Sequence, residues 1–115
     1  MDDAKREALK AAGIDVEDAV RRFMGKEELM MKFLLRFGQD PNFGLLRQAL
    51  EEGDTARAYE AAHALKGVAG NLSLRVVFAR SGELVDSLRA GDLQQAKAGF
   101  PALEESYRAV LDAIG

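Results

Sequence analysis

The sequence has 115 residues, of which 48% are hydrophobic and 30% are charged, with a formal net charge of -3. This length and balance fit one globular domain with a single core, so residues 1–115 are predicted to form one domain. The absence of cysteine excludes disulfides and thiol catalysis, and because there is also only one histidine, the usual zinc sites are excluded as well. The acidic balance and scattered arginines argue against a nucleic-acid partner, because binding to a phosphate backbone usually requires a basic face.

The N-terminal residues 1–7 are mostly charged, and no segment approaches the roughly 18 consecutive apolar residues that a membrane span requires. We therefore expect a soluble, cytoplasmic protein with no membrane segment. No feature of the sequence demands a dimer, so a monomer is expected.

Helix-forming residues dominate the chain and no alternating strand pattern competes with them, which predicts an all-α fold. In chain order, the first predicted element is a short helix over Val16–Phe23. A longer helix follows over Lys26–Phe37. Breaks are expected at turn formers, namely Gly13, Met24–Gly25, Asp40–Pro41, Gly53–Asp54, Ser73, Gly91–Asp92 and Pro101.

Apolar residues on both sides of Pro41 recur at steps of three and four, which is typical of amphipathic helices. The first stripe consists of Leu29, Met30, Phe33, Leu34 and Phe37, and the second of Phe43, Leu45, Leu46, Ala49 and Leu50. The pattern fits either one long helix bent at Pro41 or two helices in sequence.

Two later connections contain the same pair of residues, a glycine that ends one helix and an aspartate that caps the next. These are Gly53–Asp54, before the helix that carries His63, and Gly91–Asp92, before the last helix. Short connections of this kind join antiparallel neighbours. The sequence therefore predicts an up-down-up-down four-helix bundle with an additional short N-terminal helix packed across one end.

The only histidine, His63, is predicted to project into solvent from the middle of its helix. At about 100° per residue, the core face of this helix consists of Ala58, Ala61, Leu65, Val68 and Leu72. The residues within about 60° of His63 are Ala56, Tyr59, Glu60, Lys66, Gly67 and Gly70.

Gly67 and Gly70 each cost the helix about 1 kcal/mol relative to alanine, so a packing or functional reason for them is expected. We interpret both as giving a partner access to His63. Gly67 could instead end the helix as a C-cap, but the apolar stripe continues through Val68 to Leu72.

An exposed imidazole is a nitrogen nucleophile that is largely neutral at cytoplasmic pH. If His63 received a phosphoryl group, Lys66 one turn away would offset the negative charge of the transition state. Tyr59 and Glu60 could line a docking face. The chain has no P-loop and no GxGxxG motif, so no kinase activity of its own is expected, and the absence of a GxSxG motif leaves a hydrolase unsupported.

The segment His63-Ala64-Leu65-Lys66-Gly67, with Gly70 three residues further on, resembles the signature of histidine-containing phosphotransfer (HPt) domains. This resemblance implies a four-helix bundle in which His63 accepts a phosphoryl group from a receiver-domain aspartate and passes it to another receiver. It implies that Lys66 and Gly67 support transfer. The implied partners are response-regulator receivers and a hybrid sensor histidine kinase, and the receiver supplies magnesium while the chain holds no cofactor of its own.

The sequence departs from that pattern after the motif, with Ser73–Leu74 and Leu84–Val85 at positions where the family often has other residues, and with Gly82 expected to interrupt a helix. Two rival functions stay open. One is a helical adaptor that binds a partner without phosphotransfer, through apolar residues among Phe23, Met24, Met30 and Met31. The other is the phospho-accepting domain of a larger histidine kinase.

Overall fold

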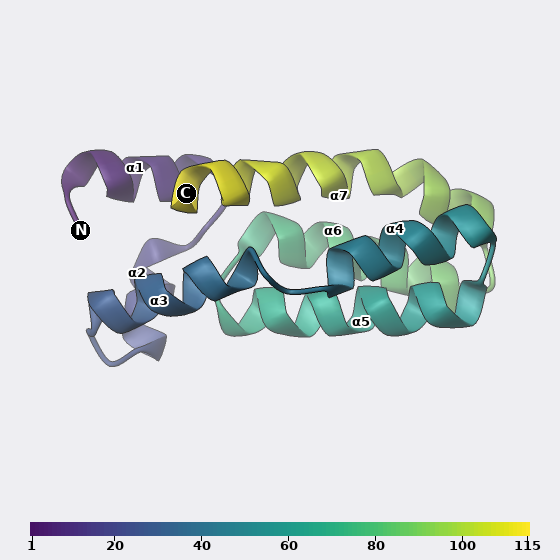
Figure 1. Cartoon of the computed structure of the whole chain (residues 1–115), viewed down its shortest axis with the longest axis horizontal. Helices are drawn as coiled ribbons and strands as arrows, with labels where there is room; N and C mark the ends of the chain where they lie inside the picture. The colour runs from purple at the N-terminus through teal and green to yellow at the C-terminus, as the bar shows by residue number, and fades with distance from the viewer.

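We describe the fold from a computed structural model, which covers residues 1–115. The chain forms seven helices: α1 (Asp3–Ala11), α2 (Val16–Arg22), α3 (Glu27–Phe37), α4 (Asn42–Glu52), α5 (Thr55–Asn71), α6 (Arg75–Arg89) and α7 (Leu93–Ile114). The helices α4 to α7 run side by side in alternating directions, and α4 contacts α7 to close the bundle (Figure 1). The predicted all-α, up-down-up-down four-helix bundle is confirmed.

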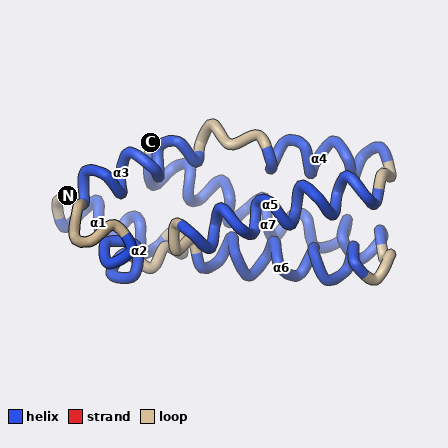
Figure 2. Tube along the Cα trace, turned by 90° about the horizontal axis from the view of Figure 1, so that it is seen from below, coloured by secondary structure: helices blue, strands red, loops and turns tan.

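The stretch around Pro41 consists of two helices and not one bent helix, which settles the question that the sequence left open. A loop separates α3 from α4, and the two helices follow each other along one edge of the molecule (Figure 2). The Asp40 carboxylate accepts hydrogen bonds from the Asn42 backbone N–H at 2.9 Å and from its side-chain amide at 2.8 Å. Asp40 therefore stabilises the start of α4, where Pro41 has no N–H of its own to donate.

The two glycine–aspartate connections have the predicted geometry. Gly53 and Gly91 have φ angles of +71° and +75°, which glycine adopts at little cost. The Asp54 carboxylate accepts a hydrogen bond from the Arg57 backbone N–H at 3.1 Å, and the Asp92 carboxylate accepts one from Gln95 at 3.0 Å. Both aspartates are N-caps, so the tight turns before α5 and α7 follow directly from these residue pairs.

Two predicted interruptions are wrong. Pro101 lies inside α7, a continuous helix of 22 residues, and Gly82 lies inside the continuous helix α6. In α7 the buried side chains of Leu103, Tyr107 and Val110 pack into the bundle, and this tertiary packing outweighs the backbone hydrogen bond that proline cannot make. None of the seven helices combines the length and hydropathy needed to span a membrane.

The hydrophobic core is one cluster to which each of the last five helices contributes a fully buried leucine: Leu34, Leu46, Leu65, Leu84 and Leu103. The two stripes beside Pro41 are only partly buried. Leu45 is 51% exposed, and Leu29 and Phe33 are exposed to 39% and 36%. Leu45, although part of the second apolar stripe, is therefore not a core residue; its side chain lines a groove between α4 and α5.

The apolar residues considered for an adaptor surface do not form one exposed patch. Met30 is fully buried, Met31 and Phe23 pack against the core, and only Met24 is widely exposed, at 85%. The rings of Phe23 and Phe33 pack together with centroids 5.3 Å apart. These residues are mainly structural, as methionine and aromatic residues at helical spacing usually are.

The N-terminal part has two short helices, where the sequence predicted one. Helix α1 lies beside the end of α7, and the Lys5 ammonium donates a hydrogen bond to the Ala113 carbonyl oxygen at 2.6 Å (Figure 1). Helix α2 is tied to the α5–α6 turn, because the Ser73 hydroxyl donates to the Asp18 carboxylate at 2.6 Å. Ser73 has a φ of +58°, which is unfavourable for a residue other than glycine, so this bond offsets part of the backbone strain.

Replacing Asp18 with asparagine should destabilise the fold most at neutral pH and least in acid. Hydrogen bonds from Ser73 and Arg22 hold the pKa of Asp18 well below its usual range. A depressed carboxyl pKa contributes stability that is fully present above the ordinary value, near pH 4, and is lost as the pH falls below it. Thermal unfolding followed by circular dichroism gives the melting temperature of each protein at pH 7 and pH 3. The difference in melting temperature between wild type and Asp18→Asn should be smaller at pH 3 than at pH 7. Asp112→Asn, at an exposed position of α7, is the control and should have the melting temperature of the wild type at both pH values.

Candidate functional site

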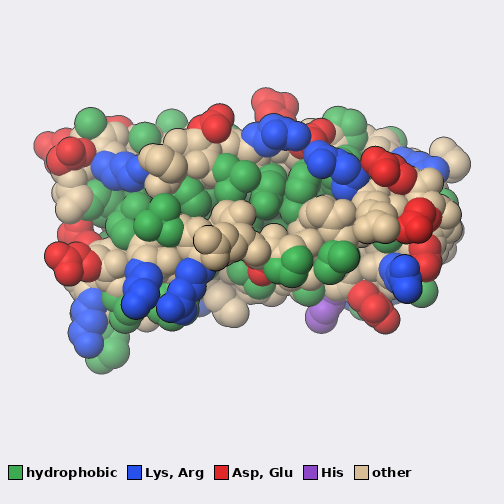
Figure 3. Space-filling view, in the orientation of Figure 1, with side chains coloured by type: hydrophobic (Ala, Val, Ile, Leu, Met, Phe, Trp, Pro, Cys, Tyr) green, Lys and Arg blue, Asp and Glu red, His purple; other side chains and the backbone are tan.

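Helix α5 presents His63 to solvent from its middle. The helix continues through Gly67 and Gly70 to Asn71, so the interpretation of Gly67 as a C-cap is excluded. Ala58, Leu65 and Ala69 are fully buried on the opposite face. In the space-filling view the single histidine stands at the surface, near side chains of both charges (Figure 3).

The imidazole of His63 contacts the ring of Tyr59, one turn earlier on α5. The two rings stack with centroids 5.8 Å apart and an angle of 18° between their planes. His63 takes part in no ion pair and no side-chain hydrogen bond of the chain. Its ring nitrogens are therefore free to react, while stacking restricts the orientation of the ring.

Tyr59 is itself held by Arg89, near the end of α6. The Arg89 guanidinium donates a long hydrogen bond of 3.4 Å to the Tyr59 hydroxyl and lies 5.8 Å from the centre of its ring. The Tyr59 hydroxyl raises the pKa of Arg89 above its ordinary value. Tyr59 is half-buried and stacks on His63 within the chain, and its role in a docking face stays a prediction.

Lys66 lies on the same side of α5 as Tyr59 but reaches across to α6. Its ammonium nitrogen lies 5.3 Å from the centre of the Phe78 ring. A methyl group built on Gly82 would lie 3.6 Å from the Lys66 Cε atom, so the lysine stem runs along the bare backbone of α6. No carboxylate forms an ion pair with Lys66, so its positive charge is not neutralised.

The two glycines near His63 have different surroundings. A methyl group on Gly67 would meet nothing within 4 Å, so this position is open to solvent or to another molecule. A methyl group on Gly70 would lie 3.2 and 3.3 Å from two carbons of the Phe78 ring. Gly70 thus has a packing reason within the chain, and its predicted role in access is not needed to explain it.

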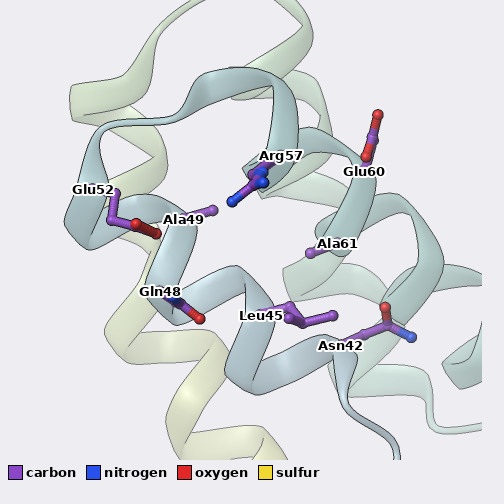
Figure 4. A pocket seen from close by; sticks show the side chains of 8 residues that line it. All are labelled: Asn42, Leu45, Gln48, Ala49, Glu52, Arg57, Glu60 and Ala61. Atoms are coloured by element: carbon purple, nitrogen blue, oxygen red, sulfur yellow. The ribbon is translucent and has the colours of Figure 1, made fainter.

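Glu60 lies on the other side of His63, toward α4. It lines a groove between α4 and α5, with Asn42, Leu45, Gln48, Ala49 and Glu52 from α4, and Arg57 and Ala61 from α5 (Figure 4). Leu45 lies on the α4 side of this groove and Arg57 on the α5 side, so its walls are of mixed character. The Glu60 side chain is exposed at this groove, and its role in docking stays a prediction.

The chain contains no group of three or more His, Cys, Asp or Glu side chains that could hold a metal ion. The chemical groups gathered around His63 are a stacked phenol, an unpaired ammonium and a bare stretch of helix at Gly67. Such a surface can expose a nitrogen nucleophile beside a positive charge and leave room for another molecule to approach.

A comparison with protein families supplies the deciding observation. The family model described as "Hpt domain" matches residues 39–113, which span α4 to α7 and include His63. The chain belongs to the Hpt domain family. Hpt domains take part in phosphotransfer in two-component signalling and interact with receiver domains and kinases. No curated protein and no solved structure matches the chain in the corresponding searches.

Two residues of this Hpt domain that contact the site were missed from the sequence. Arg89 holds Tyr59, and Phe78 lies under Lys66 and against Gly70. Arg89 looked like an ordinary cation in the last turn of a helix, and Phe78 like part of an apolar stripe. The available signal was the pair Gly70 and Gly82, since two glycines inside helices indicate that something large lies against the backbone.

Proposed function

We propose that this Hpt domain is an intermediate of a phosphorelay, accepting a phosphoryl group on His63 from the aspartate of a receiver domain and passing it to another receiver. The observation that carries the proposal is the exposed imidazole, free of hydrogen bonds, beside the open position Gly67. The donor receiver belongs to a hybrid sensor kinase or to a response regulator.

The transfer is a displacement at phosphorus. The unprotonated ring nitrogen of His63 attacks the phosphorus of the aspartyl phosphate, so that an N–P bond forms as the P–O bond to aspartate breaks. The aspartate leaves as a carboxylate with the bonding electron pair. In the second step the carboxylate of another receiver attacks the phosphorus, the N–P bond breaks, and the imidazole is released. The transition state is loose and places negative charge on three oxygens.

Each structural feature of the site has a part in this scheme. Tyr59 stacks on the imidazole and limits its orientations, so less rotational freedom is lost when a receiver docks. Gly67 leaves the receiver's active-site loops room to reach His63. Lys66 carries an unneutralised positive charge one turn away, and the receiver supplies the magnesium ion that its own aspartyl phosphate requires.

The experiment that tests the proposal mixes the purified chain with receiver domains phosphorylated on aspartate with a radiolabelled phosphate. The expected result is label on the chain that is stable in alkali and lost in acid, as a phosphoramidate is. Addition of a second, unlabelled receiver should then remove this label. If none of the receivers labels a chain shown to be folded, the relay is contradicted and the adaptor or the dedicated kinase donor gains support.

Removing the charge of Lys66 should slow the transfer without preventing it. In Lys66→Met the nucleophile is intact but the transition state loses a nearby cation, and we expect a rate about tenfold lower, or about 1.4 kcal/mol. Single-turnover transfer at saturating receiver measures this. Lys97→Met, at an exposed position of α7, is the matched control and should keep the wild-type rate. An unchanged rate in Lys66→Met would exclude Lys66 from the reaction.

A further inference from the structure

Phe78 is the least expected side chain near the site, because a large aromatic residue is 41% exposed on α6. Its ring lies against the backbone of α5 at Gly70, where two ring carbons would be 3.2 and 3.3 Å from an added Cβ atom. Such distances are closer than ordinary van der Waals contact. The ring can therefore take this position because residue 70 has no side chain.

Lys66 is fitted into the same surface. Its Cδ and Cε atoms and its ammonium nitrogen lie 3.8, 3.6 and 3.9 Å from the Cβ position of Gly82, which is van der Waals distance, so the lysine stem runs along α6 at this glycine. The ammonium nitrogen lies 5.3 Å from the centre of the Phe78 ring, within the range of a cation–π contact. Thus Gly70 makes room for the Phe78 ring, and the stem of Lys66 packs beside Gly82 on the neighbouring helix.

The type of side chain that holds the Lys66 ammonium decides whether its positive charge is neutralised. A carboxylate would hold the ammonium but would neutralise the charge that a phosphoryl group needs. An aromatic face attracts a cation through its quadrupole and leaves the net charge in place. A free lysine side chain also loses much rotamer freedom when it is fixed, so one that is already held loses less when the phosphoryl group arrives.

From this arrangement we propose that Phe78 is a positioning residue for phosphotransfer, which holds the Lys66 ammonium on the α5–α6 surface, ordered and unneutralised, one turn from His63. The inference rests on the proposed function, since it assigns a role in that reaction. It also gives a packing reason for Gly70, which the sequence suggested was a point of partner access, and it places the Lys66 stem beside Gly82, which was expected to interrupt a helix.

An exposed aromatic residue near a reactive group could instead be an apolar contact for the docked receiver. The two roles differ in one measurable respect. A residue that acts through Lys66 loses its effect when Lys66 is absent, whereas a docking contact keeps its effect. A double-mutant cycle separates these cases.

The test measures single-turnover transfer from a phosphorylated receiver to the wild type, Phe78→Leu, Phe78→Tyr, Lys66→Met and the double variant Lys66→Met/Phe78→Leu. We expect Phe78→Leu to slow transfer about two- to fivefold, the size of a cation–π contact at an exposed site. Phe78→Tyr should keep the wild-type rate because tyrosine retains the aromatic face. Adding Phe78→Leu to Lys66→Met should cause no further slowing. Val76→Thr, which changes another exposed apolar residue of α6, should leave the rate unchanged.

Proton NMR provides a readout that needs no phosphate. The ε-methylene protons of Lys66 should be shifted upfield by the ring current in the wild type and in Phe78→Tyr, and the shift should disappear in Phe78→Leu. Two results would overturn the inference while leaving the relay intact. One is absence of the upfield shift in the wild type. The other is a slowing of transfer by Phe78→Leu that is as large in the Lys66→Met background as in the wild type. A wild-type chain that no receiver labels would overturn the proposed function, and this inference with it.

Discussion

Replacing His63 with glutamine should abolish phosphoryl acceptance, with no label detectable on the chain. Glutamine keeps a polar side chain of similar reach but has no nucleophilic ring nitrogen, and the chain contains no second histidine. The measurement is transfer of labelled phosphate from a phosphorylated receiver, followed by separation of the two proteins.

The fold should survive this substitution. His63 is exposed and takes part in no ion pair, so the loss is limited to its stacking on Tyr59, which we expect to be worth about 0.5–1.5 kcal/mol. Circular dichroism should show unchanged helicity. Glu105→Gln, an exposed change on α7, should be labelled like the wild type. Label on a folded His63→Gln variant would show that another residue accepts the phosphoryl group.

Placing a glutamine at Gly67 should reduce transfer strongly while stabilising the bundle. The new side chain would meet nothing within the chain, since even a Cβ atom there has no neighbour within 4 Å, but it would stand where the receiver must approach His63. We expect transfer to fall about 10- to 100-fold, which corresponds to about 1.4–2.8 kcal/mol. Replacing a helical glycine should raise the free energy of unfolding by about 0.5–1 kcal/mol.

Gly44→Gln is a close control for Gly67→Gln. Gly44 also lies inside a helix, is exposed, and would bear a Cβ atom without neighbours within 4 Å, but it belongs to α4 and not to the helix of His63. Both variants should gain stability in urea unfolding, and only Gly67→Gln should lose transfer. Equal transfer rates in the two variants would mean that Gly67 does not lie under the docked receiver.

Local sequence signals were sufficient for most of the architecture. Gly53–Asp54 and Gly91–Asp92 predicted the tight turns before α5 and α7, because a left-handed glycine and an aspartate cap act within a few residues. The exposure of His63 followed from the apolar stripe on the opposite face of α5.

Features that depend on contacts between distant helices could not be predicted in this way. Pro101 lies within α7 because the packing of residues such as Leu103 and Tyr107 outweighs a local propensity. Gly70 and His63 share one side of α5, which suggested a common role, but Gly70 lies against Phe78 of α6. Periodicity shows which residues share a face and does not show which side chain of another helix covers them.

The most direct test of the account is to locate the phosphoryl group on the chain itself. Cleavage after Arg57 and Lys66 at neutral pH releases the peptide Ala58–Lys66, which contains the only histidine together with Tyr59. Mass spectrometry after transfer from a receiver should find this peptide heavier by one phosphoryl group, with fragment ions that place the group on His63 and with loss of the group in mild acid. An acid-stable phosphate on Tyr59, or a phosphate confined to any other peptide, would contradict the account.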